Sequence, residues 1–450
     1  MKTQVRQTIN PRELAHRALL EFQRTRRPPD EILDRLFQID ISDQNRAFAW
    51  EITLGSIRYL KRLDFIAEIY IKAPLSAQKP EILAGLRIGL YQLIEIANIP
   101  QFAAVHETVR LFSQRLLDRD AGFVNAVLRS YLREPERVIY PSPKNDPVAY
   151  LATYYSYPEW LVRRWLTAFG YEETMKILIA NNNRPKTSFK IVTQKVDVEK
   201  IINALKDDGL ELEKSRYFPD YISTEAGSVV IKTDIFKNGN LIVQDESQGL
   251  PIYLLNPPVG AAVLDLCSAP GGKTVALADK VGPEGKIISL DIDKHRLELV
   301  RQNAEKTGLR NIEFVHEDLL KFASSEKFKY ILLDVPCSAI GTLSRNADLK
   351  WTRTENDIKA FSRLQLTMLN KASELLDEDG RIVYSTCTTE PEEIEEVIKG
   401  FLKSHATFAI EQDESGILEA FEEPSGIYRT WPHIHGIGGG GFALLKRKYG

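Results

Sequence analysis

The sequence's candidate nucleophiles are cysteines, and all three cysteines of the chain lie beyond residue 260. Cys337 and Cys387 each follow an apolar run, in DVPCSAIG and YSTCTTEPEE, where small and polar neighbours would let a thiol face a cleft. A thiolate is a strong nucleophile, so two thiols placed in this way are candidates for a chemical role. A buried cysteine is ordinarily an inert apolar side chain, and the residues alone assign that role to Cys267.

The segment after Cys387 has the pattern of a helix start. Thr389 is the expected cap, Pro391 suits the first turn, and Glu392 is placed to close a capping box. The expected apolar face consists of Ile394, Val397, Ile398, Phe401 and Leu402. A thiol just before a helix N-terminus lies in a field that favours its thiolate, although the residues alone leave open whether Cys337 or Cys387 is the nucleophile.

The stretch VLDLCSAPGGKT, residues 263–274, leads from an apolar run into a Gly-Gly-Lys-Thr turn. It matches the phosphate-binding pattern G-x-x-x-x-G-K-[ST] except that Cys267 replaces the first glycine. Pro270 removes a backbone N–H that a phosphate nest would need, so phosphate binding is disfavoured. Asp291 ends the next strand about 20 residues later, where a carboxylate can accept hydrogen bonds from a pair of ribose hydroxyl groups. Alternatively, Asp291 is a strand-end cap, a role that Asp293 could equally have. An ATPase with YILLDVP as its magnesium-binding strand is the rival interpretation.

Five apolar runs of buried-strand length alternate with helical patterns from about residue 245, which predicts a doubly wound, Rossmann-like parallel sheet. The runs are AAVLDLC, KIISLDI, IEFVHE, YILLDVP and GRIVYSTC. Ligands of such sheets bind at the carboxyl ends of the strands. The side chains at those ends are Cys267, Asp291, Asp318, Asp334 with Cys337, and Cys387. Each of the five strand ends therefore carries a residue suited to binding or catalysis.

Two further segments precede this α/β domain, so a multidomain fold is predicted. Apolar residues recur at helical spacing through residues 10–135, which indicates an all-helical bundle, and the proline-rich stretch REPERVIYPSPKNDP then indicates a linker. In the next segment TSFKIVT, GSVVIKT and NLIVQD are predicted strands, and DVEKIINALKDDG is a predicted helix ended by Gly209. The expected domains are a helical domain over 1–140, a small α/β domain over 141–240 and a catalytic domain over 241–450.

Composition and charge limit the class of protein. With 43% hydrophobic and 27% charged residues, the 450-residue chain is typical of globular proteins with two or three domains. Membrane-length apolar runs, a signal-peptide core and C-x-x-C spacing are all missing, so a reduced, cytoplasmic protein is expected. Net charge is +5 over residues 1–145, zero over 146–240 and −8 over 241–450. A basic N-terminal part suits nucleic-acid binding, although it is also an ordinary solvated helical surface.

Taken together, the motifs resemble those of the RNA cytosine-5 methyltransferases. LDLCSAPGGKT is similar to their S-adenosylmethionine loop, DVPCSAIGT to their Asp-x-Pro-Cys motif and YSTCTTEPEE to their Thr-Cys motif. Residues 1–140, including FVNAVLR, resemble the helical domain of antitermination factor NusB, and QDESQG precedes the first strand as in the family. Over nearly the whole chain the arrangement is similar to the bacterial 16S ribosomal RNA branch of the Sun or Fmu type.

The resemblance implies a reaction and its residues. S-adenosylmethionine is expected against Cys267, Ser268, Ala269, Pro270, Gly271, Gly272, Lys273, Asp291, Asp318 and Asp334. Cys387 matches the family's nucleophile, Cys337 the residue that helps resolve the covalent adduct, and Asp334 is the expected acid near N3 of cytosine. Thiolate addition at C6 is needed because C5 of cytosine is too weakly nucleophilic to take a methyl group directly. The expected substrate is an unpaired or flipped-out cytosine of 16S ribosomal RNA, naked or in a partly assembled small subunit, without a metal or a membrane.

Some residues depart from the family pattern, and others have ordinary explanations. The departures are Ile394 for Asn, Ala339 for Gly, Ser344 for Arg, Ala347 for Pro and Gly440 for Asp. The pair His433 and His435 lacks a third metal ligand nearby, so a loop role is expected. Arg345 and Trp351 are candidates for RNA contact, with core packing at least as good an explanation for the tryptophan. The alternative functions are a tRNA cytosine-5 methyltransferase, a P-loop-like ATPase and a noncatalytic RNA-binding factor.

Overall fold

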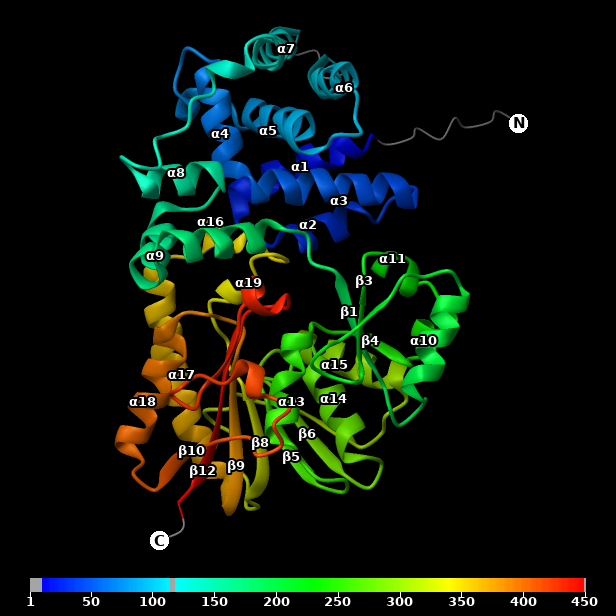
Figure 1. The fold of residues 1–450 in the computed structure, drawn as a ribbon. Helices are drawn as coiled ribbons and strands as arrows, with labels where there is room; N and C mark the ends of the chain where they lie inside the picture. Colours follow the sequence, from blue (N-terminus) through cyan, green and yellow to red (C-terminus); the bar gives the residue numbers. More distant parts are fainter. Residues whose placement is uncertain (1–9, 114–117, 449–450) are drawn as a thin grey trace, which may run out of the picture. The chain divides into compact units, whose positions relative to one another are not determined.

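The computed structural model describes residues 10–113 and 118–448, which divide into two compact units (Figure 1). The helical unit extends to Asn182 and also includes the segment Asn346–Thr352, whereas the α/β unit consists of Asn183–Arg345 and Arg353–Gly450. The helical unit therefore continues past residue 140, the boundary expected for the first domain. Within the described ranges, no helix has both the length and the apolar character needed to cross a membrane.

Helices make up the first unit, as the spacing of its apolar residues predicts. Asn10 caps the first helix by accepting a hydrogen bond from Arg12 N at 3.0 Å, and the apolar faces of the helices meet in one core that includes Phe22, Ile52 and Leu128. The predicted linker contains the short 3-10 helix Pro135–Arg137. The helices are α1 (Pro11–Thr25), α2 (Pro29–Leu36), α3 (Asp43–Arg58), α4 (Leu60–Ile69), α5 (Pro80–Glu95), α6 (Gln101–Ser113), α7 (Asp118–Arg133), α8 (Pro147–Tyr154) and α9 (Glu159–Asn182).

The segment Asn346–Thr352, with helix α16 (Leu349–Thr352), packs inside this unit. Trp351 Nε1 donates a hydrogen bond to Ile57 O at 2.7 Å. Lys350 is buried, and its Nζ donates to Asn182 Oδ1 at 2.6 Å. Trp351 is therefore a packing residue of the helical unit, which is the structural alternative to RNA contact.

The small α/β region of the second unit contains a four-stranded antiparallel sheet of order β2-β3-β1-β4. Its strands are β1 (Thr187–Ile191), β2 (Glu213–Lys214), β3 (Tyr221–Thr224) and β4 (Leu241–Val243), and its helices are α10 (Val198–Asp207), α11 (Gly227–Val230) and α12 (Asp234–Lys237). As predicted, the helix at DVEKIINALKDDG is followed by Gly209, which has φ +80°. The predicted strand GSVVIKT is wrong, because a single helical turn forms there. That turn buries Val230, leaves Val229 and Ile231 exposed, and satisfies its own backbone groups.

The rest of the second unit is built on a larger sheet. Among the described residues its order is β10-β12-β9-β8-β5-β6-β7, with β11 paired to β12. The strands are β5 (Ala262–Leu266), β6 (Lys286–Asp291), β7 (Ile312–His316), β8 (Phe328–Asp334), β9 (Leu376–Thr386), β10 (Phe408–Glu411), β11 (Tyr428–Thr430) and β12 (Gly440–Arg447). Strands β5 to β9 pair in parallel, as predicted, but β10, β11 and β12 pair antiparallel. The expectation of a purely parallel sheet is therefore corrected to a mixed, Rossmann-like sheet.

Alternate residues of the central strands pack on opposite faces of this sheet. Leu332 and Val383 belong to the core formed with α13 (Leu250–Leu255) and α14 (Gly272–Val281). Leu333 belongs to the opposite core, formed with α17 (Glu355–Leu375) and α18 (Glu395–Ser404). Helix α15 (Lys294–Thr307) follows β6, and α19 (Pro432–His435) lies between β11 and β12. Because both faces are covered, reacting groups can gather at the strand ends.

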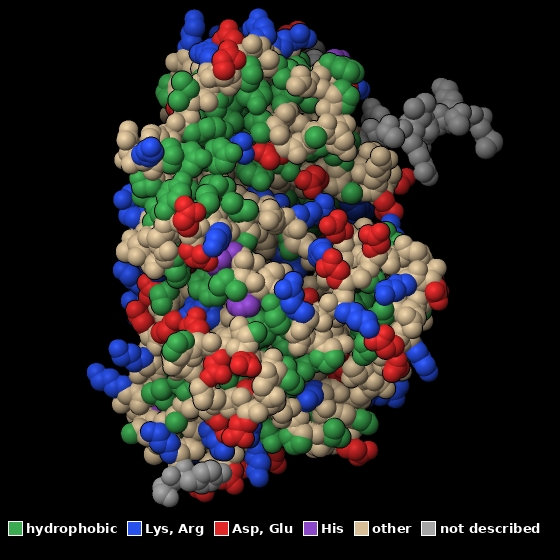
Figure 2. Space-filling model, viewed as in Figure 1, with side chains coloured by type: hydrophobic (Ala, Val, Ile, Leu, Met, Phe, Trp, Pro, Cys, Tyr) green, Lys and Arg blue, Asp and Glu red, His purple; other side chains and the backbone are tan. Residues whose placement is uncertain are grey.

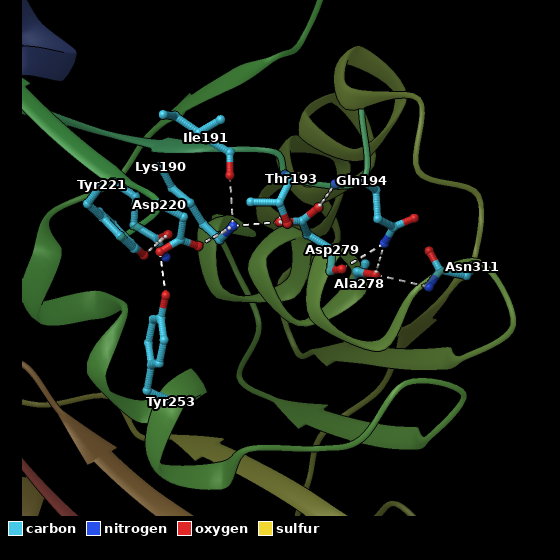
Figure 3. A network of polar contacts seen from close by, with 11 residues as sticks. Lys190, Ile191, Thr193, Gln194, Asp220, Tyr221, Tyr253, Ala278, Asp279 and Asn311 are labelled. Carbon is cyan, nitrogen blue, oxygen red and sulfur yellow. Dashed lines mark hydrogen bonds and ion pairs between the residues drawn. The ribbon is translucent and has the colours of Figure 1, made fainter. Parts of the chain in front are cut away.

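A buried charge network joins β1 of the small sheet to α14 (Figure 3). Lys190 Nζ lies 2.6 Å from Asp279 Oδ2 and 2.9 Å from Asp220 Oδ2, and it donates to Ile191 O at 3.0 Å. Asp279 also accepts hydrogen bonds from the backbone N–H groups of Thr193 and Gln194. The small sheet is thus tied to the helix that begins at the Gly-Gly-Lys-Thr turn.

Candidate active site

The loop after β5 is held by neighbouring side chains at the carboxyl edge of the sheet. Cys267 has φ +60° and Gly271 has φ +100°. A Cβ on Gly271 would lie 2.7 Å from Val300 Cγ1, so glycine allows the loop to lie directly on α15. Asn303 Nδ2 donates to Pro270 O at 2.9 Å, and Ala269 N donates to Asp291 Oδ2 at 3.0 Å. The loop backbone is therefore fixed from two sides.

The acidic residues expected near the cofactor have distinct local roles. Asp291 is buried, and its second oxygen accepts a hydrogen bond from Asp293 N at 2.9 Å. Asp293 accepts hydrogen bonds from the first backbone N–H groups of α15, so the helix cap is Asp293. Asp318 follows β7 and accepts a hydrogen bond from Leu320 N at 3.0 Å. Each Asp291 oxygen accepts one backbone hydrogen bond, and a carboxylate oxygen has lone pairs for more than one.

A cavity of about 390 Å³ lies against this loop. Of the predicted site residues it is lined by Ser268, Ala269, Pro270, Gly271, Gly272, Lys273 and Asp334. Cys267, Asp291 and Asp318 are outside this lining. Gln244 also lines the cavity, and its buried Nε2 has no hydrogen-bond partner among the described residues. The donors and carboxylates here suit a cofactor that has a ribose, a carboxylate and a positive charge, as S-adenosylmethionine does.

Asp334 ends β8 beside the cavity, within a polar cluster. Lys273 Nζ lies 2.8 Å from Asp334 Oδ2 and also donates to Gln248 Oε1, while Ser385 Oγ donates to Asp334 Oδ1 at 2.8 Å. Asp265 is fully buried one strand away, and burial raises its pKa to about 7 although it accepts a hydrogen bond from Thr274. Asp334 therefore has a fixed orientation, set by a cation and a hydroxyl group.

The two predicted catalytic thiols meet at the same edge of the sheet. Strands β8 and β9 are adjacent and parallel, with Asp334 opposite Ser385, so the loops that follow them lie side by side. Cys337 Sγ is 3.0 Å from Cys387 Sγ. The hydrogen bond to Cys387 and burial raise the pKa of Cys337 well above that of a free thiol. Burial likewise raises the pKa of Cys267, in keeping with an inert thiol there.

The predicted helix start after Cys387 needs correction. Residues Pro391–Glu393 form a 3-10 turn, and α18 begins at Glu395 without a side-chain cap, so the capping box of Thr389 and Glu392 is wrong. Cys387 stands eight positions before Glu395, so it does not lie directly before the first turn of α18 as the predicted helix field required. The apolar face is confirmed, because Ile394, Val397, Ile398 and Phe401 are buried and Leu402 packs against the same core.

Sequence reasoning missed Glu393, which is fully buried and hydrogen-bonded to the loop of Cys337. It accepts hydrogen bonds from Ser338 N and Gln365 Nε2, both at 2.9 Å. No local signal marks it, because Glu393 stands in the acidic run EPEEIEE and its hydrogen-bond partners come from distant segments of the chain.

Other residues singled out in the sequence have structural roles. The Arg345 guanidinium lies 2.6 Å from the Asp245 carboxylate. That carboxylate is held in place by hydrogen bonds from the backbone N–H groups of Ser247 and Gly438. Trp431 N donates a hydrogen bond to His435 Nδ1 at 2.8 Å. Across the described part of the chain, no group of three or more His, Cys, Asp or Glu side chains is arranged to bind a metal ion.

Three departures from the family motifs have a visible setting. Ala339 adopts φ +59°, where the Gly usual in the family would be unstrained. Ile394 has 0% exposure, and it packs in the core beneath α18. A Cβ on Gly440 would lie 2.7 Å from Phe442 Cζ and 2.8 Å from Thr386 O, so Asp would not fit there without a shift.

Comparison with known proteins agrees with this architecture. Sequence models of three families match: the NusB family over residues 9–133, an RsmF/B-like ferredoxin-like domain over 157–230 and the 16S rRNA methyltransferase RsmB/F over 252–446. The chain is 32% identical to the probable ribosomal RNA small subunit methyltransferase B of Bacillus subtilis strain 168, covering 97% of this chain and 98% of that protein. It is also 32% identical to the ribosomal RNA small subunit methyltransferase B of Klebsiella pneumoniae strain 342, covering 88% and 90%.

Solved structures point the same way. A crystal structure of a methyltransferase homologue from Pyrococcus horikoshii superimposes with a TM-score of 0.60 at 27% identity, covering 69% of this chain and 100% of its own. The chain therefore belongs to the RsmB/F family of S-adenosylmethionine-dependent ribosomal RNA methyltransferases, with an N-terminal NusB domain.

Proposed function

We propose that this protein methylates C5 of a cytosine in 16S ribosomal RNA through a covalent bond between Cys387 and C6 of the base. The observation that carries the proposal is the pair of thiols 3.0 Å apart, at the strand end that also holds Asp334. A methyltransferase acting on a ribose hydroxyl or on an exocyclic amine would have no use for a nucleophilic thiol, whereas C5 of cytosine needs one. The thiols therefore favour C5 among the possible target atoms.

Each residue of the cluster has a step in the proposed reaction. The Cys387 thiolate adds to C6, and the displaced π electrons make C5 nucleophilic. The negative charge that develops around N3 is stabilised by the Lys273 cation and by a proton that Asp334 gives as an acid. When bound, S-adenosylmethionine supplies the electrophilic methyl group. The C5 proton must then leave so that the C6–S bond can break, and Cys337 is assigned to this resolution step. Cys267 to Lys273, with Asp291, Asp318 and Asp334, are the proposed cofactor-binding residues.

The proposed substrate is an unpaired or flipped-out cytosine in naked or partly assembled small-subunit RNA, because C6 is inaccessible in a stacked helix. A ribosomal RNA substrate also supports the expected cytoplasmic location. RNA affinity is assigned mainly to the helical and small α/β domains, residues 1–140 and 141–240. On the face shown in Figure 2, basic and acidic side chains are interspersed, so this assignment depends on the net charges of the domains. If residues 1–240 supply most of the RNA affinity, RNA binding should depend more strongly on salt concentration for the full chain than for residues 241–450.

A denaturing gel with S-adenosylmethionine and 16S RNA tests the assignment of the thiols. Cys387→Ser is expected to abolish methylation and form no adduct, because the nucleophile is lost. Cys337→Ser is expected to form the C6–S bond and stall, which gives a slow-migrating protein–RNA band. The same band from Cys387→Ser alone would reverse the two roles.

Mapping of the labelled base distinguishes the alternative functions. Incubation with labelled S-adenosylmethionine and either small-subunit RNA or tRNA should label a cytosine in the former. Label in tRNA alone would favour the tRNA alternative. Binding of ATP in place of S-adenosylmethionine would favour the ATPase, and RNA binding without label a noncatalytic factor.

A further inference from the structure

A buried carboxylate that the proposed mechanism does not use lies between the two cysteine loops. Glu393 has 0% exposure and ends the 3-10 turn Pro391–Glu393. Glutamate is almost never fully buried unless its oxygens are paired, because an ionised carboxylate loses its hydration on burial. The hydrogen-bond donors around Glu393 therefore indicate what the residue holds in place.

Most of these donors come from the loop of Cys337. Glu393 Oε2 accepts a hydrogen bond from Ser338 N at 2.9 Å, and Oε1 accepts one from Ser338 Oγ. Gln365 Nε2 donates to Glu393 Oε2 and to Pro336 O, both at 2.9 Å. The residues on both sides of Cys337 are thus fixed by Glu393, directly or through Gln365.

The same cluster holds the loop of Cys387. Ser338 Oγ lies 2.9 Å from Thr388 Oγ1, next in sequence to Cys387. Tyr384 OH donates to Glu393 O at 2.6 Å, which fixes the end of β9 just before that loop. The buried carboxylate is therefore bonded, within one intermediate residue, to the neighbours of both thiols.

We propose that Glu393 is a positioning residue for the methylation reaction, which holds the Cys337 loop against the Cys387 loop and so sets the distance between the two thiols. The contribution of Glu393 to catalysis rests on the function proposed above, whereas its contribution to the distance between the two thiols does not. Glu393 touches neither thiol, and it acts through Ser338 and Thr388.

Oxidation of the free protein measures the thiol geometry without RNA or cofactor. Diamide accepts two hydrogens from a pair of thiols and leaves a disulfide, so the rate of Cys337–Cys387 disulfide formation, followed by peptide mass spectrometry, reports how often the thiols meet. Glu393→Ala is expected to slow this reaction by about tenfold or more, since a released loop loses the effective concentration of its thiol. Glu396→Gln, an exposed carboxylate on α18, is the matched control and should oxidise as the wild type does.

Steady-state kinetics separates positioning from substrate binding. Glu393→Ala should lower kcat on the order of 100-fold and leave the KM for RNA within a few-fold, because misplacing reacting groups by about 1 Å costs that much. Glu393→Gln keeps one acceptor oxygen for Ser338 and is expected to lie between alanine and wild type in both assays.

Two results would overturn the proposal. One is a wild-type rate of disulfide formation in folded Glu393→Ala and Glu393→Gln, and the other is a rise in KM with unchanged kcat. If Glu393→Ala does not fold by circular dichroism, Ser338→Ala provides the test, since it removes only the hydroxyl contacts to Glu393 and Thr388, and its unchanged oxidation rate would equally refute the role. If Glu393→Ala slows disulfide formation but the wild-type protein does not methylate cytosine, the proposed function is wrong, whereas the role of Glu393 in holding the two thiols together still stands.

Discussion

Replacing Lys190 by methionine is expected to destabilise the protein by about 3 kcal/mol. Methionine nearly preserves the length and apolar stem of the side chain but removes its charge. Asp220 and Asp279 would then face each other across the site without a cation. Their mutual repulsion, added to the cost of burial, would favour the unfolded chain.

The magnitude follows from the burial and the remaining partners of the network. The side chains of Lys190, Asp220 and Asp279 are 5%, 12% and 2% exposed. Removing one member of a buried ion pair costs about 3–5 kcal/mol. Asp279 keeps hydrogen bonds from Thr193 N at 3.0 Å and Gln194 N at 2.9 Å, which places the cost at the lower end of that range. Native domains are stable by about 5–15 kcal/mol, so the loss would be readily measured.

Urea unfolding of the full chain, followed by circular dichroism, checks this reasoning. Lys200→Met on the exposed side of α10 is the matched control and should change the free energy of unfolding by less than about 0.5 kcal/mol. Lys190→Met combined with Asp279→Asn should cost less than the two single losses added together, because one buried charge is removed along with its partner. A loss below about 1 kcal/mol for Lys190→Met would refute the view that the network carries buried, paired charges.

Three further predictions concern single residues of the catalytic region. Burial raises the pKa of Asp265 to about 7, so between about pH 4 and pH 7 the folded chain holds a proton that the unfolded chain releases. The free energy of unfolding of the wild type, relative to that of Asp265→Asn, should therefore fall as pH rises through this range, by at most ~1.4 kcal/mol per pH unit. Urea titrations at several pH values check it, and a pH-independent difference would contradict it. Asp291→Ala should weaken S-adenosylmethionine binding about tenfold or more while the fold persists, because the proposed acceptor for the ribose is lost; unchanged calorimetric affinity would rule this out. Ala339→Gly should raise thermal stability by up to about 1 kcal/mol, since glycine relieves the left-handed strain of Ala339, and a lower melting temperature would contradict the strain.

The carboxyl edge of the sheet could be predicted from sequence because strand ends are local signals. Apolar runs predict where the strands lie in the sequence, and the carboxyl ends of parallel strands meet at one edge of the sheet. Asp334 and Cys337 are therefore expected near the residues that follow a neighbouring strand. The adjacency of β8 and β9 then brings Cys387 to Cys337. The order of the five strands follows from the same pattern, whereas β9 begins at Leu376, four residues before the predicted run GRIVYSTC.

Features that depend on tertiary partners could not be predicted in this way. The run at Gly227–Val230 is apolar enough for a strand, yet only Val230 has a core to enter, so a helical turn forms there. The antiparallel strands β10 and β12 add to the sheet through pairing over a long sequence separation, which no local period reveals. Glu393 stands in an acidic segment whose composition is typical of a solvent-exposed helix start. Its burial depends on hydrogen bonds donated by Ser338 and Gln365, which are distant in sequence.

The geometry around the thiols also bears on how two similar groups can take different roles. Two sulfurs 3.0 Å apart cannot both carry a charge, so the pair shares one proton once the first thiol has ionised. The hydrogen bond to Cys387 and burial raise the pKa of Cys337, which favours a proton on Cys337, and Cys387 is the proposed thiolate. On the proposed mechanism, the bond from Cys387 to C6 turns that thiolate into an uncharged thioether. The hydrogen bond to Cys387 that raises the Cys337 pKa is then lost, so Cys337 can pass its proton to solvent and, as a thiolate, accept the C5 proton when that proton leaves.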